Sequence, residues 1–117
     1  MNTEQLQELI ITTLDEYKAK DITVLDVREL TQIMDTMIIC CGTSKRHLKT
    51  LSEQLVVKAK ENGIKPLGIE GEDTGEWVLV DLSDIVVHIM MPETREFYSL
   101  EKLWSTTERV REKTHDH

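Results

Sequence analysis

Gly42, Thr43 and Ser44 stand where a phosphate-binding loop would stand, between an apolar run and a helical pattern. Backbone N–H groups at a helix N-terminus bind phosphate in many nucleotide-binding proteins. The known phosphate-binding fingerprints need further glycines or a Gly-Lys-Ser/Thr sequence, and this chain has neither here. A helix cap at Thr43 or Ser44 explains these residues without a ligand.

Two carboxylates, Asp81 and Asp84, could hold a metal ion beside Ser44, as a metal-dependent nucleotidyltransferase requires. They do not form an Asp-x-Asp pair, and no third carboxylate is evident beside them. A turn residue and a charge at the end of a strand are the simpler interpretation. The transferase therefore stays as the enzymatic alternative.

His88 and the two cysteines also lack the neighbouring residues that a metal site, a disulfide or a catalytic site would need. His88 has no second His or Cys near it in the sequence, so it is expected to be a satisfied or partner-facing side chain. Cys40 and Cys41 are adjacent, which suits neither a disulfide nor a metal site, and we expect both to be buried. We predict no catalytic residue, no metal site, no cofactor and no enzymatic activity.

Hydrophobic periodicity predicts one α/β (α+β) domain over residues 1–105, followed by a charged tail at 106–117. The element order is α-β-β-α-β-β-β-α, with a mixed five-stranded sheet and helices mainly on one face. The first expected helix is capped by Asn2 or Thr3 and has an apolar face that runs to Tyr17. The others are 45–62 and a segment after Pro92 with Phe97, Leu100, Leu103 and Trp104 on its apolar side. The expected strands are 22–27, 37–41, 64–69, 77–82 and 85–91, and Pro66 means that the third of them lies at an edge or is irregular.

The two strands of the predicted hairpin each have an aliphatic and a mixed side, because side chains alternate across a sheet. The aliphatic sides suit a core covered by helices and consist of Val78, Val80, Leu82, Ile85, Val87, Ile89 and Met91. The mixed sides consist of Trp77, Leu79, Asp81, Val86, His88 and Met90. An apolar face with polar members usually marks an interaction site, so we predict that it docks onto a partner. The alternative is that Trp77 and Met90 pack under the C-terminal segment as ordinary core.

Charge is unevenly distributed along this chain, whose net charge is −8. Residues 43–63 carry +3, whereas residues 64–94 carry −6 and include an acidic loop at 70–76 directly before Trp77. Phosphate repels an acidic chain, so we expect no direct binding to nucleic acid. A basic protein partner is favoured, because complementary charge steers encounter. The simpler alternatives are that the acidity only aids solubility and that the basic segment is a solvated helix face.

An ordered set of short motifs from about Leu6 to Trp104 resembles the ribosomal silencing factor, or Iojap-like, family. The motifs are Val24-Leu25-Asp26-Val27, Asp35, Gly42-Thr43-Ser44, Glu70-Gly71, Trp77-Val78-Leu79 with Asp81, Val87-His88-Ile89, Arg95-x-Phe97-Tyr98, Leu100-Glu101 and Leu103-Trp104. The resemblance implies a nucleotidyltransferase-like fold without transferase activity. It also implies binding to protein fourteen of the large ribosomal subunit, which prevents joining with the small subunit and slows translation in starvation or stationary phase. Relatives in organelles assist assembly of the large subunit, and that role is an alternative here.

We therefore predict a docking site on the mixed sheet face. Its members are an apolar anchor of Trp77, Leu79, His88 and Met90, a carboxylate rim of Glu70, Glu72, Asp73 and Asp81, and an edge completed by Arg95 and Tyr98. The same patch could hold a second copy of the chain as a homodimer. No apolar run approaches the ~20 residues of a membrane span, and the N-terminus lacks a signal-peptide plan, so we expect a cytoplasmic protein.

Overall fold

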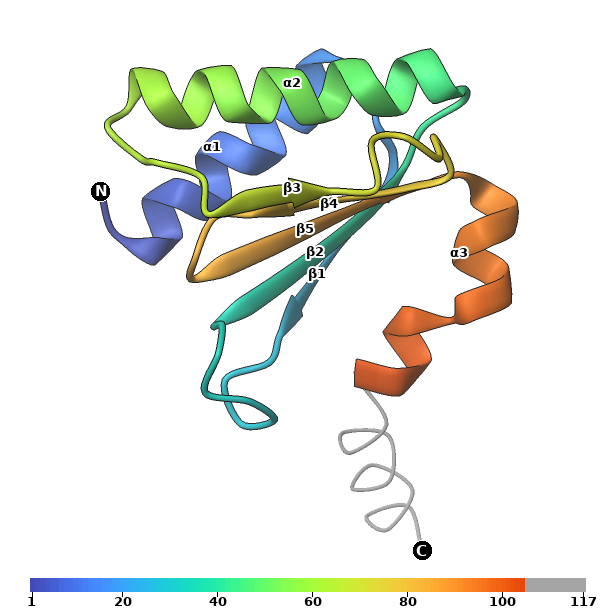
Figure 1. Ribbon diagram of the computed structural model, residues 1–117. Coiled ribbons are helices and arrows are strands. Elements are labelled where there is room, and N and C mark those ends of the chain that lie inside the picture. The colour runs from blue at the N-terminus through green and yellow to red at the C-terminus, as the bar shows by residue number, and fades with distance from the viewer. Residues whose placement is uncertain (105–117) are drawn as a thin grey trace, which may run out of the picture.

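Five strands form one open mixed sheet in the computed structural model, which describes residues 1–104 (Figure 1). The strands are β1 Lys20–Asp26, β2 Thr36–Cys41, β3 Gly68–Glu70, β4 Trp77–Asp81 and β5 Ile85–Met90, in the spatial order β1-β2-β5-β4-β3. Only β2 and β5 are parallel; the other three neighbouring pairs are antiparallel. The predicted five-stranded mixed sheet and the element order are confirmed. The predicted tail at 106–117 lies outside the described residues.

Two long helices, α1 Thr3–Glu16 and α2 Lys45–Glu61, cover one face of the sheet (Figure 1). The side chain of Asn2 accepts a hydrogen bond from the backbone N–H of Gln5 at 2.8 Å, and Oε1 of Gln5 accepts one from the backbone N–H of Asn2 at 3.0 Å, which completes a capping box. Ser44 caps α2 by accepting the N–H of His47 at 3.1 Å. The Gly-Thr-Ser sequence is therefore used as a helix start. Among the described residues, no helix has both the length and the hydropathy to cross a membrane.

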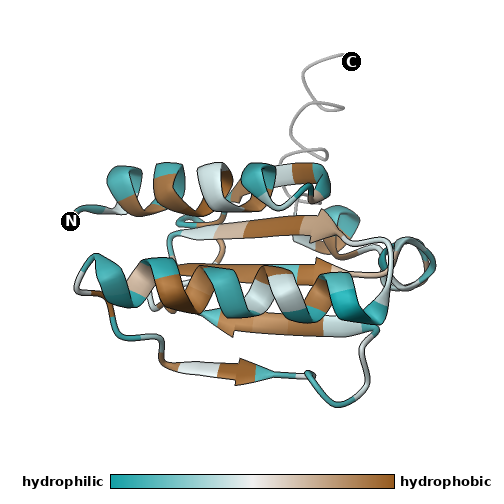
Figure 2. Cartoon of the chain, turned by 90° about the horizontal axis from the view of Figure 1, so that it is seen from above, coloured by the Kyte–Doolittle hydropathy of each residue, from teal (hydrophilic) through white to brown (hydrophobic). Residues whose placement is uncertain are grey.

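The main hydrophobic core lies between these helices and the sheet. Polar and apolar residues recur along both helices, while the strands beneath them are largely apolar (Figure 2). The helices bury Leu6, Ile10, Leu14, Leu48, Leu51, Leu55 and Ala59. The sheet contributes Ile38, Cys40, Val78, Val80, Leu82, Ile85, Val87 and Ile89. The predicted aliphatic side of the hairpin thus faces the helices.

A second, smaller hydrophobic cluster lies on the opposite face of the sheet. Its buried members are Val27, Met37, Ile39 and Met90, and the half-buried residues packed against them are Leu25, Met34, Trp77, Leu100 and Trp104. All six residues of β2 and all six of β5 are buried, as expected for inner strands covered on both faces. The sheet therefore has a covered patch on the face that the mixed pattern predicted to be open.

The bounds of β1 and β3 differ most from the predicted ones, whereas β2, β4 and β5 each differ by one residue at one end. β1 begins two residues early, at Lys20, and its register against β2 shifts between Lys20 and Thr23, where Asp21 has φ of 50°. β3 is shorter than expected and begins at Gly68, after Pro66 rather than through it, because proline cannot donate to the ladder. Its position at the edge of the sheet is confirmed.

The C-terminal helical segment is broken into two pieces. α3 spans Pro92–Tyr98 and ends at Ser99, which has left-handed backbone with φ of 48°. Helical backbone resumes at 100–104. The residues predicted to form one apolar side are therefore divided. Leu100 and Trp104 pack on the second cluster, whereas Phe97 and Leu103 are exposed.

Candidate docking surface

Trp77 begins β4 and lies half-buried at the border of the second hydrophobic cluster. Its indole N–H donates to Nδ1 of His88 at 2.9 Å. The two rings lie 5.8 Å apart between centroids at an angle of 48°. Trp77 pairs in register with Met90 on β5. The indole therefore reaches along β5 to His88, which lies two residues before Met90 and on the same face. This bond fixes the orientation of the indole.

His88 is buried and neutral. An indole N–H can only donate, so Nδ1 of His88 carries the lone pair and Nε2 carries the proton. Burial lowers the pKa of His88 to about 4. Only 6% of the residue is exposed, so His88 supports Trp77 from beneath rather than facing a partner.

An aromatic cluster of Trp77, Tyr98 and Phe97 extends outward from this pair. The Tyr98 ring lies 4.8 Å from the Trp77 ring, and the Phe97 ring meets Tyr98 edge-on at 5.0 Å. Tyr98 is 53% exposed and Phe97 is 81% exposed. Aromatic side chains so exposed at the end of a helix are typical of a binding surface.

The acidic loop 70–76 adjoins this cluster, between the N-terminus of α2 and the start of α3 (Figure 1). The backbone N–H of Met91, which precedes α3, donates to the carbonyl of Glu76 at 2.9 Å. On the other side, Gly75 lies directly against the Lys45 side chain. The side chains of Glu72 and Asp73 are exposed. The loop therefore presents negative charge beside the aromatic cluster, as the sequence order predicted.

Other members of the predicted anchor and rim lie elsewhere. Met90 is fully buried in the second cluster, so the alternative that it packs under the C-terminal segment is the correct one. Leu79 is half-buried opposite His88. Asp81 lies at the other end of β4, about 13 Å from Trp77 at the usual rise per residue, and accepts a hydrogen bond from the N–H of Ser83. It does not share a rim with the acidic loop.

Arg95 points into the molecule, so its expected place at the edge of the docking site is wrong. Only 11% of its side chain is exposed. It donates from Nη1 to the carbonyl of Asp21 at 2.6 Å, from Nη2 to Oγ1 of Thr23 at 2.9 Å and from Nε to Glu101 at 2.7 Å. Burial lowers the pKa of Arg95, but its hydrogen bonds to Glu101 and to Sγ of Cys41 raise it by more, so the guanidinium stays charged.

The residues of the transferase alternative do not meet. Ser44 comes shortly after Cys41, which ends β2 and pairs with Met90 at the end of β5. Asp84 directly precedes Ile85, the first residue of β5, so it lies at the opposite end of this strand pair. Six residues of strand separate these ends by about 17 Å. Within residues 1–104, no group of three or more His, Cys, Asp or Glu side chains could hold a metal ion. The structure thus gives the predicted carboxylates no common centre with Ser44.

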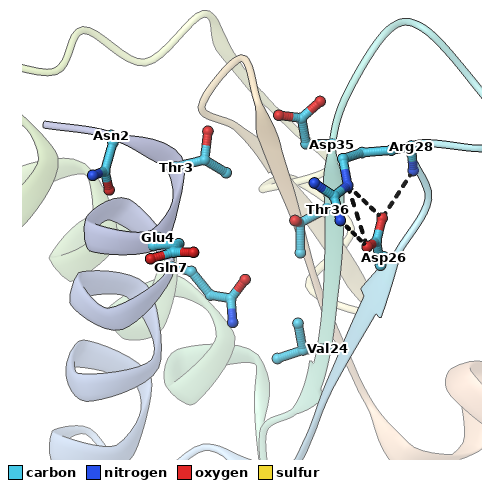
Figure 3. A pocket seen from close by; sticks show the side chains of 9 residues that line it. All are labelled: Asn2, Thr3, Glu4, Gln7, Val24, Asp26, Arg28, Asp35 and Thr36. Atoms are coloured by element: carbon cyan, nitrogen blue, oxygen red, sulfur yellow. Dashed lines mark hydrogen bonds and ion pairs between the residues drawn. The ribbon is translucent and has the colours of Figure 1, made fainter.

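A polar cleft of about 830 Å³ lies away from the aromatic cluster, between the first turn of α1 and the β1–β2 end of the sheet (Figure 3). Its lining consists of Asn2, Thr3, Glu4, Gln7, Val24, Asp26, Arg28, Asp35 and Thr36. Arg28 binds Asp26 with Nη2 and Oδ2 2.6 Å apart, and the hydrogen bonds from Arg28 lower the pKa of the Asp26 carboxyl. None of the predicted site residues lines this cleft.

Phe97 is a member of the surface that the residue pattern did not indicate. Periodicity placed it on the apolar side of a helix, together with Leu100 and Trp104. One signal was available, because neighbouring residues on a helix point about 100° apart, so Phe97 and Tyr98 leave the helix in different directions and one of them is less well placed to pack on the core.

The chain is similar to known proteins over most of its length. The family described as ribosomal silencing factor during starvation matches residues 1–117. A ribosomal silencing factor of Chromobacterium violaceum is 43% identical over 104 residues, which cover 89% of this chain and 85% of that protein. A mouse protein named mitochondrial assembly of ribosomal large subunit protein 1 is 38% identical over 101 residues, covering 84% of this chain and 44% of that protein.

The fold is also that of a solved relative. The crystal structure of a Chromobacterium violaceum protein superposes with a TM-score of 0.88 at 43% identity, covering 90% of this chain and 88% of that one. Both the sequence match and the fold extend over nearly the whole chain. This protein belongs to the ribosomal silencing factor family.

Proposed function

We propose that this chain binds the large ribosomal subunit through its protein fourteen and sterically prevents joining with the small subunit. Translation is thereby slowed in starvation or stationary phase, in the cytoplasm. The description of the family and the names of its relatives support silencing of ribosomes during starvation. The partner, protein fourteen, and the block to subunit joining are what the resemblance of the motifs implies. It requires occupancy of a surface rather than a reaction, and we propose no catalytic residue and no cofactor.

The exposed aromatic cluster is the observation that carries this proposal. Trp77 is held by His88, Tyr98 lies against Trp77, and Phe97 is almost fully exposed beside them. Rigid aromatic side chains bury a large area on binding and lose little conformational entropy, so they dominate many interfaces. In the free protein this apolar area faces water, which favours a partner that covers it.

The acidic loop supports a basic partner. Glu70, Glu72 and Asp73 are exposed, and no ion pair within residues 1–104 involves these three carboxylates. Ribosomal proteins that contact RNA are rich in Lys and Arg, because they neutralise phosphate. Complementary charge at the rim accelerates association and sets orientation, while the aromatic cluster supplies most of the binding energy.

Binding to isolated ribosomal subunits tests the proposal. Purified protein is sedimented with large subunits, and with small subunits as the control, beside a Tyr98→Ala variant. We expect the unmodified protein to bind large subunits alone, the variant to bind them more weakly, and bound protein to lower the yield of joined ribosomes when small subunits are added. Equal binding to both subunits, or to neither, would overturn the proposal.

A role in assembly of the large subunit is a second candidate, favoured by the name of the mouse relative. It would use the same surface, so variants of the aromatic cluster do not separate the two roles. The two differ in timing. An assembly factor binds precursor particles in growing cells, and its removal makes them accumulate, whereas removal of a silencing factor affects translation only in starved cells.

The aromatic cluster could also pair with itself in a homodimer. Sedimentation at increasing protein concentration would reveal such a dimer. If the dimer uses the same cluster, large subunits will dissociate it, because one surface cannot hold two occupants.

A further inference from the structure

α3 lacks the usual means by which a helix is attached to a domain. None of its seven residues, Pro92–Tyr98, is buried. Most helical stability in proteins comes from packing an apolar face against a core, and an isolated helix of this length is unstable in water. The two ends of α3 are held, because the N–H of Met91 before it bonds the carbonyl of Glu76 and Leu100 and Trp104 beyond it pack on the second cluster. A further interaction is needed along α3 itself, which carries the two aromatic residues.

Arg95 supplies such an interaction from the inner side of α3. Its guanidinium reaches the beginning of β1, where it binds the carbonyl of Asp21 and the hydroxyl of Thr23. β1 is an edge strand, and its register shifts between Lys20 and Thr23, so Asp21 has no partner in the ladder and its carbonyl accepts from Arg95 instead. A planar guanidinium presents several donors in a fixed fork, which matches two acceptors on one strand.

The same guanidinium also holds the helical piece beyond the break. Nε of Arg95 donates to Oε1 of Glu101 at 2.7 Å, across the left-handed residue Ser99. A charge-assisted hydrogen bond of this length, with only 11% of the arginine side chain exposed, is stronger than a surface ion pair. Arg95 thus joins three parts of the chain, namely β1, α3 and the helical piece 100–104.

We infer that Arg95 is a positioning residue for the docking surface, which it serves without touching the partner. This inference rests on the proposed function and deepens it. Arg95 fixes α3 on the edge of the sheet, and α3 in turn places Tyr98 against Trp77 and Phe97 outside Tyr98. Without Arg95, α3 separates from β1, and the aromatic cluster loses two of its three rings while the main core stays intact.

Hydrogen exchange of the free protein tests the attachment itself. The backbone N–H groups of Arg95, Ser99 and Leu103 are hydrogen-bonded within the two helical pieces and report their protection. In Arg95→Ala these amides should exchange at least about ten-fold faster, while the core amides of α1 and α2 keep their rates. Arg95→Lys should restore only part of the protection, because one ammonium cannot serve all three acceptors. Glu96→Ala, an exposed change on the same helix, is the matched control and should leave exchange unchanged.

Binding to isolated large subunits tests the positioning role. Arg95→Ala should weaken binding of the otherwise unmodified protein about ten-fold. In a background that already carries Phe97→Ala and Tyr98→Ala, the same change should alter affinity less than about two-fold, because there are no rings left to position. This non-additivity is a result that a direct contact between Arg95 and the partner would not give.

Three outcomes would overturn the inference. If the losses add in the double background, Arg95 contacts the partner itself. If α3 keeps its protection in Arg95→Ala, the side chain does not hold the helix. If α3 loosens but affinity is unchanged, its position is irrelevant to docking. Absence of binding by the unmodified protein would instead overturn the proposed function, and the exchange experiment would still decide whether Arg95 holds α3.

Discussion

The indole N–H of Trp77 and Nδ1 of His88 are joined by a hydrogen bond of 2.9 Å between neighbouring strands of the β4–β5 hairpin. The bond couples the half-buried indole of Trp77 to the buried imidazole of His88. Trp77 keeps a fixed orientation against Tyr98. Nδ1 of His88 gains a hydrogen-bond donor at a buried position, where an unpaired nitrogen would destabilise the fold.

Replacement of Trp77 by alanine should affect both stability and binding. The change removes the central ring of the cluster and leaves Nδ1 of buried His88 without its donor, so we expect unfolding free energy to fall by about 2–4 kcal/mol. Affinity for large subunits should fall by about 2–4 kcal/mol, the usual effect of losing an aromatic anchor. Urea unfolding and subunit binding measure the two effects. Trp77→Phe is the control: it keeps a ring against Tyr98 and should retain most of the affinity. Unchanged affinity in a folded Trp77→Ala protein would refute the anchor.

Acid should destabilise the protein through His88. Burial lowers the pKa of His88 from its ordinary value of 6.5 to about 4, so the unfolded state binds a proton at a higher pH than the folded state does. The contribution is therefore fully present above pH 6.5 and is lost as the pH falls toward 4, with a total of up to about 3 kcal/mol. Urea unfolding between pH 7.5 and 4.5 measures it. His88→Gln can still accept from Trp77 but does not titrate, so its stability should change less over the same range. Parallel pH profiles for the two proteins would contradict the assignment.

Phe97→Ala should weaken binding without weakening the fold. Phe97 is 81% exposed, so its loss should change unfolding free energy by less than about 0.5 kcal/mol. Ile33 offers a matched control, because it is 85% exposed but lies in the β1–β2 connection rather than beside the aromatic cluster. Phe97→Ala should reduce affinity for large subunits about ten-fold, and Ile33→Ala should not. Equal effects from the two variants would show that exposed apolar area, rather than this cluster, drives binding.

Reversal of charge in the acidic loop should act on the rate of association. Glu72→Lys and Asp73→Lys remove attraction to a basic partner and add repulsion, so the association rate should fall several-fold at low salt while dissociation changes little. The effect should shrink as salt rises from 50 to 300 mM, because ions screen exposed charges. Stopped-flow or surface binding kinetics measure both rates. Glu16→Lys at the exposed end of α1 makes the same change in net charge as either single loop substitution, but elsewhere on the molecule. If it slows association as much, net charge rather than the loop is responsible.

Gly71 should resist substitution more than Gly63 does. Both have positive φ, 87° and 76°, which favours glycine. A Cβ at Gly71 would clash with the backbone oxygen of Trp77, whereas a Cβ at Gly63 meets nothing within 4 Å. Gly63→Ala should therefore destabilise by about 1 kcal/mol and Gly71→Ala by more, with displacement of the acidic loop and weaker binding. Urea unfolding compares the two. Equal losses would mean that the loop yields easily and does not constrain Trp77.

The fold could be predicted well because its inner strands have a strong pattern. β2 and β5 are buried on both faces, and such strands need the near-continuous apolar runs that the sequence shows. Alternation then places Val78 and Val80 toward the helices. The weak points were local. Pro66 lies before β3 rather than inside it, and Ser99 interrupts the last helix with left-handed backbone, which a serine seldom adopts.

The docking surface could be predicted only in part. Alternation identified the face of Trp77 and His88, but it cannot say whether such a face is covered by a partner or by the chain itself. Leu100 and Trp104 cover Met90, and their arrival there depends on the break at Ser99. The inward direction of Arg95 depends on the register shift in β1, more than 70 residues earlier in the chain. Contacts of this kind are set by tertiary packing, which no local pattern reports.

The parallel pairing of β2 with β5 has a consequence for the order in which the molecule can form. Thr36 pairs with Ile85 and Cys41 with Met90, so the open side of β2 stays without a partner until the chain has been made beyond Met90. Until then, the edge of a largely apolar strand is available to other nascent chains, which is a hazard for aggregation. Fragments that end before β5 should therefore fail to fold, and the last third of the chain closes the sheet in a single late step.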